Sequence, residues 1–378
     1  MDKVFKYELF NKMIRDFAVN EVKPLAHEVD EQERFPYETV EKMAKLGLMG
    51  IIVPKEYGGM GGDYKMYIKA VEELSKVCAT TGVILSAHTS LCIAPIMEYG
   101  NEEQKKKYLP KLASGEWLGA FGLTEPNAGT DANNQTTTAV KEGDHWVLNG
   151  SKIFITNAGP ANVYFVIAVT GRNPKGVECA AFIVEKGFPG FSVGKKELKM
   201  GIRGSSTCEL IFENCIVPEA NLVGKIGEGV KMALKTLDGG RVGISAQALG
   251  IAEGALEATV AYVKERKQFN KPISAFQNTQ FCLADLYTKI NAASLLVERA
   301  TEAKQNKSPM LGMYAAQAKL FAAETAMEVT TKCVQLHGGY GYTREYPVER
   351  MMRDAKITEI YEGTSEVQRM VISGNLLK

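Results

Sequence analysis

The sequence has 378 residues and lacks the patterns of a membrane protein, a disulfide-stapled protein or a metalloprotein. No apolar run approaches the ~20 residues that a membrane-spanning helix needs, and the mixed acids and bases of the N-terminal stretch are unlike a signal peptide. The seven cysteines are scattered without a C-x-x-C pair, which favours free thiols. The four histidines form no H-E-x-x-H arrangement, so we expect no metal site.

An excess of charge of one sign is also missing. The 45 Lys and Arg residues are balanced by 44 Asp and Glu residues, for a net charge of +1. This balance gives no general electrostatic reason to bind nucleic acid or an anionic membrane. We expect a cytoplasmic protein that binds neither, although an organelle protein whose leader had been removed would look the same.

The residue patterns that are present divide the chain into three parts. The hydrophobic fraction of 45% and the length suggest two or three domains. Apolar residues at helical spacing predict an N-terminal α-helical domain over residues 1–117. Short runs rich in β-branched and aromatic residues predict a middle antiparallel β domain over 118–226. Long segments dense with small residues predict a C-terminal α-helical bundle over 227–378. The fold class is therefore α+β.

Two glycine-containing segments carry local predictions. Asn149-Gly150 stands between two apolar triplets and predicts a tight turn between two strands. The regular spacing of the strands suits a small antiparallel barrel or sandwich. The loop GGMGG at 58–62 lacks the strand–GxGxxG–helix context of a dinucleotide fingerprint, which argues against a cofactor there.

Several segments, taken in order, resemble the acyl-CoA dehydrogenase family over essentially the whole chain. They are FGLTEPNAGTD at 121–131, KIFITN at 152–157, KMGIRG at 199–204, RKQF at 266–269, QLHGGYG at 335–341 and IYEGT at 360–364. The overall sequence pattern is most similar to that of bacterial short-chain (butyryl-CoA) dehydrogenases. The resemblance implies the same three-domain order, non-covalent FAD, a homotetramer and electron exchange with an electron-transfer flavoprotein.

Glu362 is the catalytic base that the resemblance implies. Desaturating an acyl thioester requires a base for the α-proton and a cofactor that accepts the β-hydride. Burial beside the flavin and the thioester should raise the pKa of Glu362 toward the working pH. A helix start at Thr364 and Ser365, with residues 365–368 fitting a capping box, would act in the opposite direction. We expect desolvation by the substrate to win.

Some family members place the base on an earlier helix, at the position of Gly240 here. Glycine cannot act as a base, which sharpens the assignment of Glu362. Asp238 and Arg241 resemble the pair that holds the CoA moiety, where arginine offers a rigid fork of donors; a surface ion pair is the plainer interpretation. Tyr361, Gly363 and Thr130 complete the implied substrate contacts.

The resemblance assigns the flavin to two sets of residues. On the ring side, Thr156 resembles the hydroxyl that bonds the ring near its hydride-accepting nitrogen, and Phe154 packs nearby. The other implied contacts within the subunit are Phe121, Leu123, Thr124, Thr130, Thr364 and Glu366. The residues that would reach the FAD pyrophosphate and adenosine from a neighbouring subunit are Arg266, Phe269, Gln277, Gln335, Gly338 and Gly339.

Asn270 stands where the family usually has glycine after the phenylalanine of the RKQF segment. Since asparagine tolerates a left-handed backbone better than most residues, we expect the turn to survive there. If the neighbouring subunit completes the flavin site, assembly and cofactor binding form one equilibrium.

Butyryl-CoA is the substrate that the resemblance favours. Propionyl-CoA and an arylacryloyl-CoA such as caffeyl-CoA remain open, because a few exchanges in a pocket shift preference by only ~1–3 kcal/mol each. The enzyme would interconvert the acyl-CoA and its trans-2-enoyl-CoA, and an anaerobe would run it as a reductase. The rival classes are an acyl-CoA oxidase, a nitroalkane oxidase, which has Asp at the Glu362 position, and a non-catalytic CoA-binding or assembly protein.

Overall fold

The computed structural model describes residues 3–173 and 176–377. Its first part is helical and confirms the N-terminal pattern. The helices are α1 Lys3–Phe17, α2 Ala26–Glu31, α3 Tyr37–Lys45, α4 Tyr64–Val77, α5 Ala79–Ser86, α6 Ala94–Tyr99 and α7 Glu102–Ala113. Pro36 stands directly before α3, Asp63 caps α4 by accepting from the Met66 N–H, and Asn101 and Gln104 form a capping box on α7. Local polar residues thus mark where these helices begin.

One apolar helix runs without interruption from α5 to α6 through a π-helical segment, Ala87–Ile93. Its length and composition would suffice to cross a membrane, but 89% of its most apolar window is buried inside the protein. His88 is fully buried on it, and its Nδ1 accepts from the Gly119 N–H at 3.0 Å while Nε2 lies 3.1 Å from the Leu112 carbonyl oxygen. This helix is therefore a central core element that connects the helical part to the first strand.

The middle part is one mixed sheet. Its strands are β1 Gly119–Gly122, β2 Thr138–Glu142, β3 His145–Ile155, β4 Val163–Asn173, β5 Gly176–Glu185, β6 Phe191–Lys196, β7 Cys208–Pro218 and β8 Leu222–Val223. They follow the order β6-β7-β3-β2-β4-β5-β8, and β1 pairs with β4. Most pairs are antiparallel, as expected, but β1 and β2 each run parallel to β4. The purely antiparallel prediction was therefore wrong for two pairs.

The turn predicted at Asn149-Gly150 is also wrong, because β3 continues through it. The pairing of β3 with β7 shifts register between Leu148 and Gly150, which marks a β-bulge, and Gly150 has φ 135°. A β-carbon at Gly150 would lie 2.7 Å from the backbone of Thr137. Glycine serves here to let a neighbouring strand approach. The Asn149 side chain accepts from the Asn214 N–H at 2.8 Å, across to β7.

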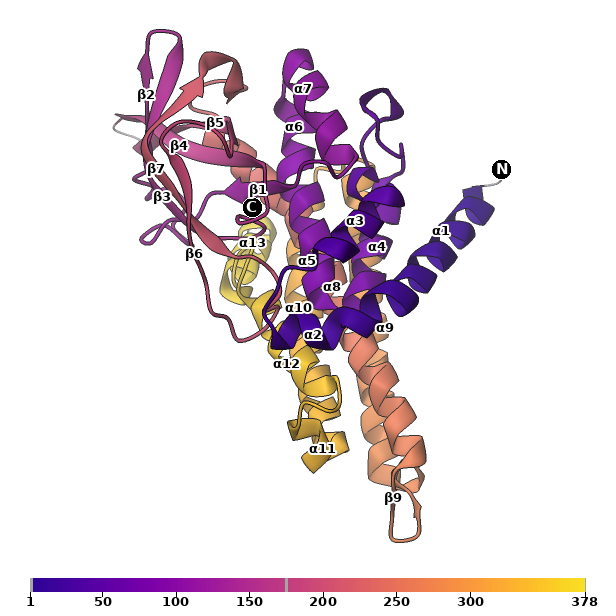
Figure 1. Cartoon of the computed structure of the whole chain (residues 1–378). Coiled ribbons are helices and arrows are strands. Elements are labelled where there is room, and N and C mark those ends of the chain that lie inside the picture. Colours follow the sequence, from indigo (N-terminus) through magenta and orange to yellow (C-terminus); the bar gives the residue numbers. More distant parts are fainter. Residues whose placement is uncertain (1–2, 174–175, 378) are drawn as a thin grey trace.

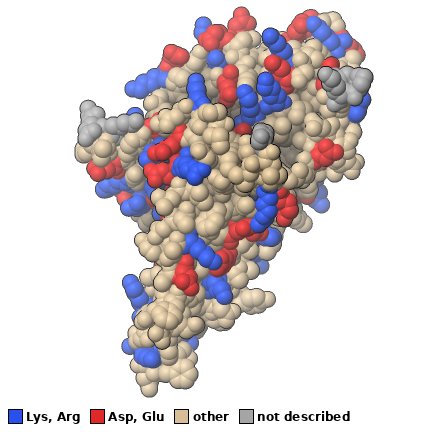
Figure 2. All heavy atoms as spheres, turned by 180° about the vertical axis from the view of Figure 1, so that it is seen from behind, with Lys and Arg blue, Asp and Glu red and all other residues tan. Residues whose placement is uncertain are grey.

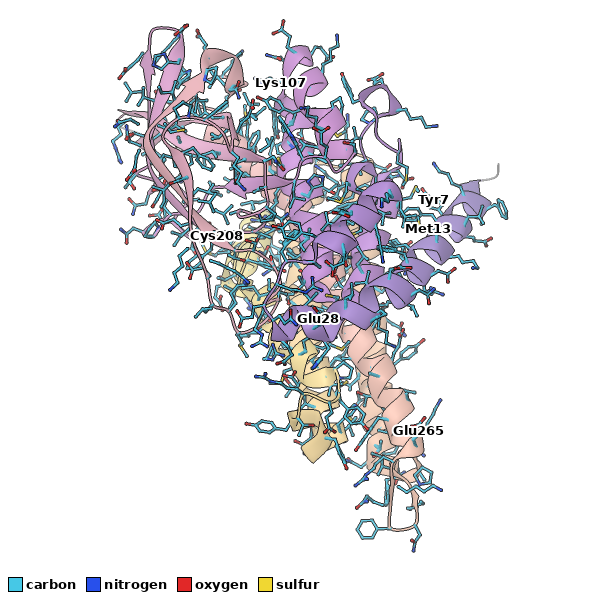
Figure 3. All side chains as sticks on the ribbon, viewed as in Figure 1. Tyr7, Met13, Glu28, Lys107, Cys208 and Glu265 are labelled. Carbon is cyan, nitrogen blue, oxygen red and sulfur yellow. The ribbon has the colours of Figure 1, made fainter. Side chains whose placement is uncertain are left out.

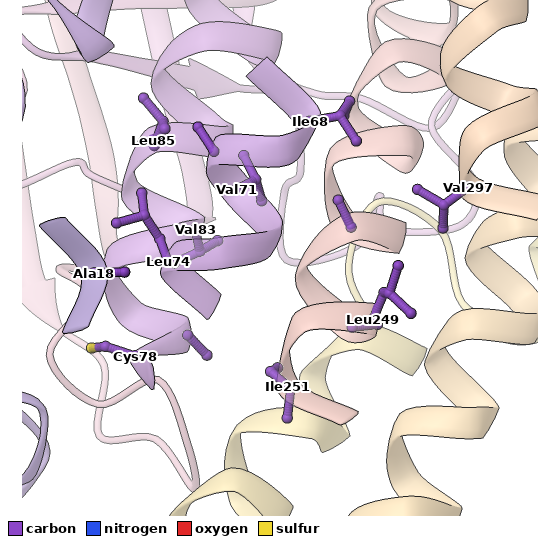
Figure 4. Close-up of a cluster of buried hydrophobic side chains, with 14 of the residues drawn as sticks. Ala18, Ile68, Val71, Leu74, Cys78, Val83, Leu85, Leu249, Ile251 and Val297 are labelled. Atoms are coloured by element: carbon purple, nitrogen blue, oxygen red, sulfur yellow. The ribbon is translucent and has the colours of Figure 1, made fainter. Parts of the chain in front are cut away.

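The third part is a bundle of long helices. They are α8 Gly229–Glu265, α9 Gln277–Gln305, α10 Leu311–His337, α11 Gly339–Tyr342, α12 Val348–Lys356 and α13 Ser365–Leu376, with a small hairpin of β9 Lys267–Gln268 and β10 Lys271–Pro272 before α9. Helix α8 packs closely on α4, since a β-carbon at Gly254 would lie 2.0 Å from the Lys76 carbonyl oxygen. Figure 4 shows Ile68 and Val71 of α4 beside Leu249 of α8 and Val297 of α9 in one buried cluster.

The segment KMGIRG at 199–204 joins the three parts of the chain. Arg203 reaches Asp30 of α2 at 3.1 Å, and Asp30 also binds Arg353 of α12 at 2.7 Å. The Ile202 N–H donates to Asp354 at 2.5 Å, and a β-carbon at Gly201 would lie 2.3 Å from the Arg353 carbonyl oxygen. This segment fixes the sheet against both helical parts. In Figure 1, α13 returns to the sheet, whereas α11 and the β9 hairpin lie at the tapering end of the bundle.

Candidate active site

Glu362 lies on a short turn between α12 and α13. Its backbone is left-handed, with φ 54°, and the following Gly363 has φ 95°. Glycine reaches such angles freely, but a glutamate does so only when its surroundings hold it. The carboxylate oxygen Oε2 is closed off from solvent and has no hydrogen-bond partner among the described residues. Glu362 therefore offers a free carboxyl oxygen inside the protein.

Burial controls the acidity of this carboxyl group. It raises the pKa of Glu362 to about 8, although the cations of Arg241 and Lys319 act in the opposite direction. Burial by the protein itself thus already moves the pKa in the direction that we expected from the flavin and the substrate. The predicted capping box over residues 365–368 was wrong by one residue. The cap of α13 is Thr364, whose side chain accepts from the Val367 N–H. One hydroxyl cap and a helix start are too weak to offset the loss of water around the carboxylate.

Gly240 of α8 gives the Glu362 carboxyl group its space. A β-carbon at Gly240 would lie 1.9 Å from Oε2 of Glu362 and 2.9 Å from the end of the Leu91 side chain. The side chain of residue 362 therefore occupies the volume beside Gly240. Any larger residue at position 240 would compete with Glu362 for the same space.

Asp238 and Arg241 form an ion pair one helical turn apart on α8. Their side chains meet at 2.7 Å, and Arg241 is buried while Asp238 is partly exposed. Arg241 also points its Nε toward the Glu362 carbonyl oxygen at 3.4 Å. The pair therefore lies beside Glu362, and the surface ion-pair interpretation does not fit the burial of Arg241.

The residues expected at the flavin ring lie on β1, the end of β3 and the loop after each. Phe121 and Leu123 are buried and share an apolar cluster with Leu91, the residue that approaches Gly240. The Ile153 N–H donates to the Thr124 carbonyl oxygen at 2.8 Å, which joins the two flavin-side segments. Thr130 is exposed on the loop after β1.

The end of β3 presents an apolar surface that the chain itself does not cover. Phe154 has φ 58° and is 61% exposed, and Thr156 beside it is half-buried. A second register shift of β3 against β7 accompanies this change of direction. An exposed aromatic side chain next to a free hydroxyl fits a flat ring with a polar edge, such as an isoalloxazine.

A buried charge network behind these segments was missed by the sequence reasoning. The Lys152 ammonium is fully buried and donates to Leu123 O at 3.1 Å, Glu125 Oε1 at 2.7 Å and Gln135 Oε1 at 2.8 Å. Glu125 also accepts from the Thr136 N–H at 2.6 Å. Lys152 and Glu125 both lie inside the segments that resemble the family, so the sequence marked their positions. Nothing in the sequence indicated that the two side chains are buried or that they pair with each other.

The second set of expected flavin residues gathers near the tapering end of the bundle. A pocket of about 540 Å³ is lined by Arg266, Gln335, Gly338 and Gly339 together with Tyr340. Arg266 lies 5.4 Å from the ring of Tyr340. A β-carbon at Gly338 or Gly339 would meet nothing within 4 Å. An open pocket with a guanidinium and glycine backbone fits the pyrophosphate part of a dinucleotide.

Phe269 and Gln277 lie outside this pocket, close to it along the chain. Phe269 stands at the tip of the β9–β10 hairpin and is 88% exposed. Asn270 has φ 62°, which confirms the expected left-handed turn without glycine. Gln277 is exposed at the first residue of α9. The described residues of the chain therefore leave the Phe269 side chain uncovered.

The two sets of flavin residues do not meet within one copy of the chain. Figure 3 shows Glu265, which precedes Arg266, near the tapering end, far from Cys208 at the sheet. Thr364 and Glu366 lie at the start of α13, and Tyr361 and Gly363 flank Glu362. Figure 2 shows both charge signs interspersed over one face and few acidic side chains at the tapering end.

Comparisons with known proteins identify the family along nearly the whole chain. Models of the acyl-CoA dehydrogenase N-terminal, middle and C-terminal domains match residues 6–116, 120–215 and 227–377. The short-chain specific acyl-CoA dehydrogenase of Clostridium acetobutylicum is 62% identical, over 98% of each chain. An acryloyl-CoA reductase (NADH) of Anaerotignum propionicum is 51% identical, over 98% of this chain and 94% of the relative.

Solved structures show the same fold. Butyryl-CoA dehydrogenase of Megasphaera elsdenii matches with a TM-score of 0.95 and 51% identity, over 98% of each chain. A chain from the structure of the electron transferring flavoprotein of Acidaminococcus fermentans matches with a TM-score of 0.95 and 54% identity, over 98% of this chain and 97% of that one.

Proposed function

The chain belongs to the acyl-CoA dehydrogenase family, and from this we propose that it interconverts butyryl-CoA and its trans-2-enoyl-CoA. As a member of the family it is an FAD-dependent oxidoreductase that acts on CH–CH bonds. The similarity to short-chain relatives supports the acyl chain length. The observation that carries the proposal is the buried, unpartnered carboxyl oxygen of Glu362, with a pKa of about 8.

Glu362 moves the α-proton of the thioester. FAD, when bound, supplies the acceptor for the β-hydride. The pKa of about 8 lies close to the working pH, so the group can take a proton in the oxidising direction and return it in the reducing direction. The burial of Oε2 keeps water away from the proton that is transferred.

The remaining site residues take the roles that their surroundings support. Arg241 and Asp238, beside the base, position the thioester and its CoA part, with Tyr361, Gly363 and Thr130. The apolar end of β3 and the β1 loop would hold the FAD ring. The residues that would hold it are Phe121, Leu123, Thr124, Thr130, Phe154, Thr156, Thr364 and Glu366.

A second copy of the chain would hold the rest of the FAD. Its residues would be Arg266, Phe269, Gln277, Gln335, Gly338 and Gly339. The separation of the two sets within one copy supports this arrangement, and we propose a homotetramer. We also propose an electron-transfer flavoprotein as the electron partner, which the match to a chain of that kind of structure supports, and a cytoplasmic location.

A second candidate is the reduction of a related enoyl-CoA. The 51% identity to an acryloyl-CoA reductase supports a propionyl-CoA/acryloyl-CoA pair. An arylacryloyl-CoA requires more space at the acyl end, where the helix of α5 and α6 carries residues of mixed size.

An anaerobic titration of the flavin spectrum tests both candidates. Butyryl-CoA should bleach the yellow enzyme, and crotonyl-CoA should restore the colour of the dithionite-reduced enzyme. A stronger response to propionyl-CoA or to caffeyl-CoA would select the second candidate. Oxygen consumption with butyryl-CoA would identify an oxidase instead, and a protein that binds no flavin would contradict the whole proposal.

A further inference from the structure

Three buried side chains converge on the turn that carries Glu362. Lys319 of α10 donates its Nζ to the Gly363 carbonyl oxygen at 2.8 Å. Gln368 of α13 donates its Nε2 to the same oxygen at 2.7 Å and to the Glu362 carbonyl oxygen at 3.3 Å. Arg241 of α8 approaches the Glu362 carbonyl oxygen at 3.4 Å. The backbone of the turn is thus held from three helices.

The turn needs such support because of its backbone conformation. Glu362 and Gly363 both have positive φ, 54° and 95°, and a residue with a β-carbon is strained there. Lys319 and Gln368 are both fully buried. A lysine is almost never fully buried without a partner, and the only hydrogen bond that the described residues give its ammonium is the one to Gly363.

Resting on the proposed function, we infer that Lys319 and Gln368 are positioning residues that hold the Glu362–Gly363 turn in its left-handed form and thereby aim the carboxyl group at the substrate. Gln368 fits closely against the turn, because a β-carbon at Gly363 would lie 2.8 Å from its Nε2. The two residues act through the backbone. Only Lys319 also carries an ammonium group, and burial lowers the pKa of that group to about 8 although Glu362 acts in the opposite direction.

The charge of Lys319 allows an experiment to distinguish its effect on Glu362 from that of Gln368. The titratable groups that interact electrostatically with Glu362 are Arg241 from α8, Lys319 from α10, the neighbouring Tyr361, and the hydroxyls of Tyr64 and Tyr67 from α4. The two cations lower the pKa of Glu362, and burial raises it. Removing Lys319 should therefore raise the pKa of the base further, whereas removing the neutral Gln368 should leave it unchanged.

The experiment compares Lys319→Met with Gln368→Met in the flavin-loaded enzyme. Methionine keeps the length and the apolar packing of each side chain and removes its donor. Both variants should lose roughly a hundredfold in kcat, because a small displacement of a catalytic group costs about this much, while KM changes little. Only Lys319→Met should shift the rising limb of the pH profile of kcat/KM to higher pH.

A matched control accounts for stability. Val329→Ala removes packing on the same helix α10, where Val329 is fully buried, and lies ten residues from Lys319, or about 15 Å along the helix. It should lower the thermal midpoint with kcat near that of the wild type. Wild-type kcat in either methionine variant, or an unmoved pH limb in Lys319→Met, overturns the inference.

The proposed substrate is tested separately from this inference. The variants are assayed with whichever thioester the wild-type enzyme turns over fastest, so a wrong choice of butyryl-CoA leaves the comparison intact. Crystal structures of the two variants give a readout that does not depend on turnover. A Glu362 side chain displaced from Gly240 supports the inference, and an unchanged left-handed turn in both variants overturns it.

Discussion

Two glutamates in this molecule each have a carboxyl oxygen closed off from solvent and lie near a buried lysine, and their pKa values move in opposite directions. Glu125 lies after β1 and pairs with Lys152 of β3. Glu362 lies on the turn between α12 and α13, near Lys319 of α10. Burial alone would raise both pKa values. In Glu125 the ammonium of Lys152 and the donors of Thr136 outweigh burial and lower the pKa to about 2. In Glu362 burial prevails, and the pKa rises to about 8.

The difference lies in where each lysine points its ammonium. Lys152 donates directly to the Glu125 carboxylate at 2.7 Å. Lys319 instead donates to the Gly363 carbonyl oxygen, which leaves the carboxylate of Glu362 with through-space attraction only. A direct, charge-assisted hydrogen bond stabilises the ionised form far more than a nearby charge does. The same pair of residue types thus makes a structural ion pair in one place and, in the other, the group that we propose transfers the α-proton.

Glu362→Gln should have the largest effect on catalysis. The amide keeps the shape of the side chain and cannot accept the α-proton, so turnover should fall by roughly a hundred- to ten-thousand-fold. The assay is acyl-CoA oxidation with an artificial electron acceptor. Flavin content and CoA-thioester affinity should stay close to those of the wild type. Turnover near the wild-type rate would show that another group is the base.

Glu125→Gln should have the largest effect on stability. It leaves the Lys152 ammonium buried without a counter-charge, and breaking such a pair costs about 3–5 kcal/mol of unfolding free energy. Urea unfolding of the flavin-loaded enzyme measures this loss. The double variant Glu125→Gln with Lys152→Met removes both charges and should recover part of it. If Glu125→Gln and Glu362→Gln proved equally stable, the two sites would not differ as described.

The sequence motifs identified Glu362 and its relation to Gly240, and the periodicity predicted the order of helical, β and helical parts. The sequence did not predict which charged side chains are buried. Lys319 stands in an alanine-rich helical segment, where a lysine is normally solvated, and only the packing of α10 against the catalytic turn buries it. Asn149-Gly150 has the composition of a hairpin turn, but pairing with β7 and the close approach of Thr137 turn it into a bulge. Tertiary contacts overrode local signals in both cases.

The two glutamates should also differ in how stability depends on pH. The carboxyl group of Glu362 has a pKa near 8 in the folded state and near 4.5 when unfolded, so the folded state binds the extra proton between these values. Its contribution to stability therefore falls as pH rises from about 5 to 8. Glu125, with its lowered pKa, contributes stability above its unfolded pKa and loses it as pH falls toward 2.

Thermal unfolding of Glu362→Gln over a range of pH tests the predicted pH dependence of the Glu362 contribution to stability. At pH 5 the variant and the wild type should have similar midpoints, because the wild-type carboxyl group is then protonated in the fold. At pH 9 the variant should be the more stable protein, by an amount on the order of a few kcal/mol. A stability difference that did not change with pH would mean that Glu362 is ionised in the fold at neutral pH, like Glu125.

Gly240→Ala should have the smallest effect and tests what keeps Glu362 unpaired. The added methyl group would lie 1.9 Å from Oε2, so the carboxyl group must move away, at a cost of about 1–3 kcal/mol for overpacking. A displaced carboxyl group closer to the cations should titrate at lower pH, with reduced kcat. Gly374→Ala on α13, where a β-carbon meets nothing within 4 Å, is the matched control and should leave both unchanged. A pH profile of Gly240→Ala that matched the wild type would show that this space does not determine the ionisation of Glu362.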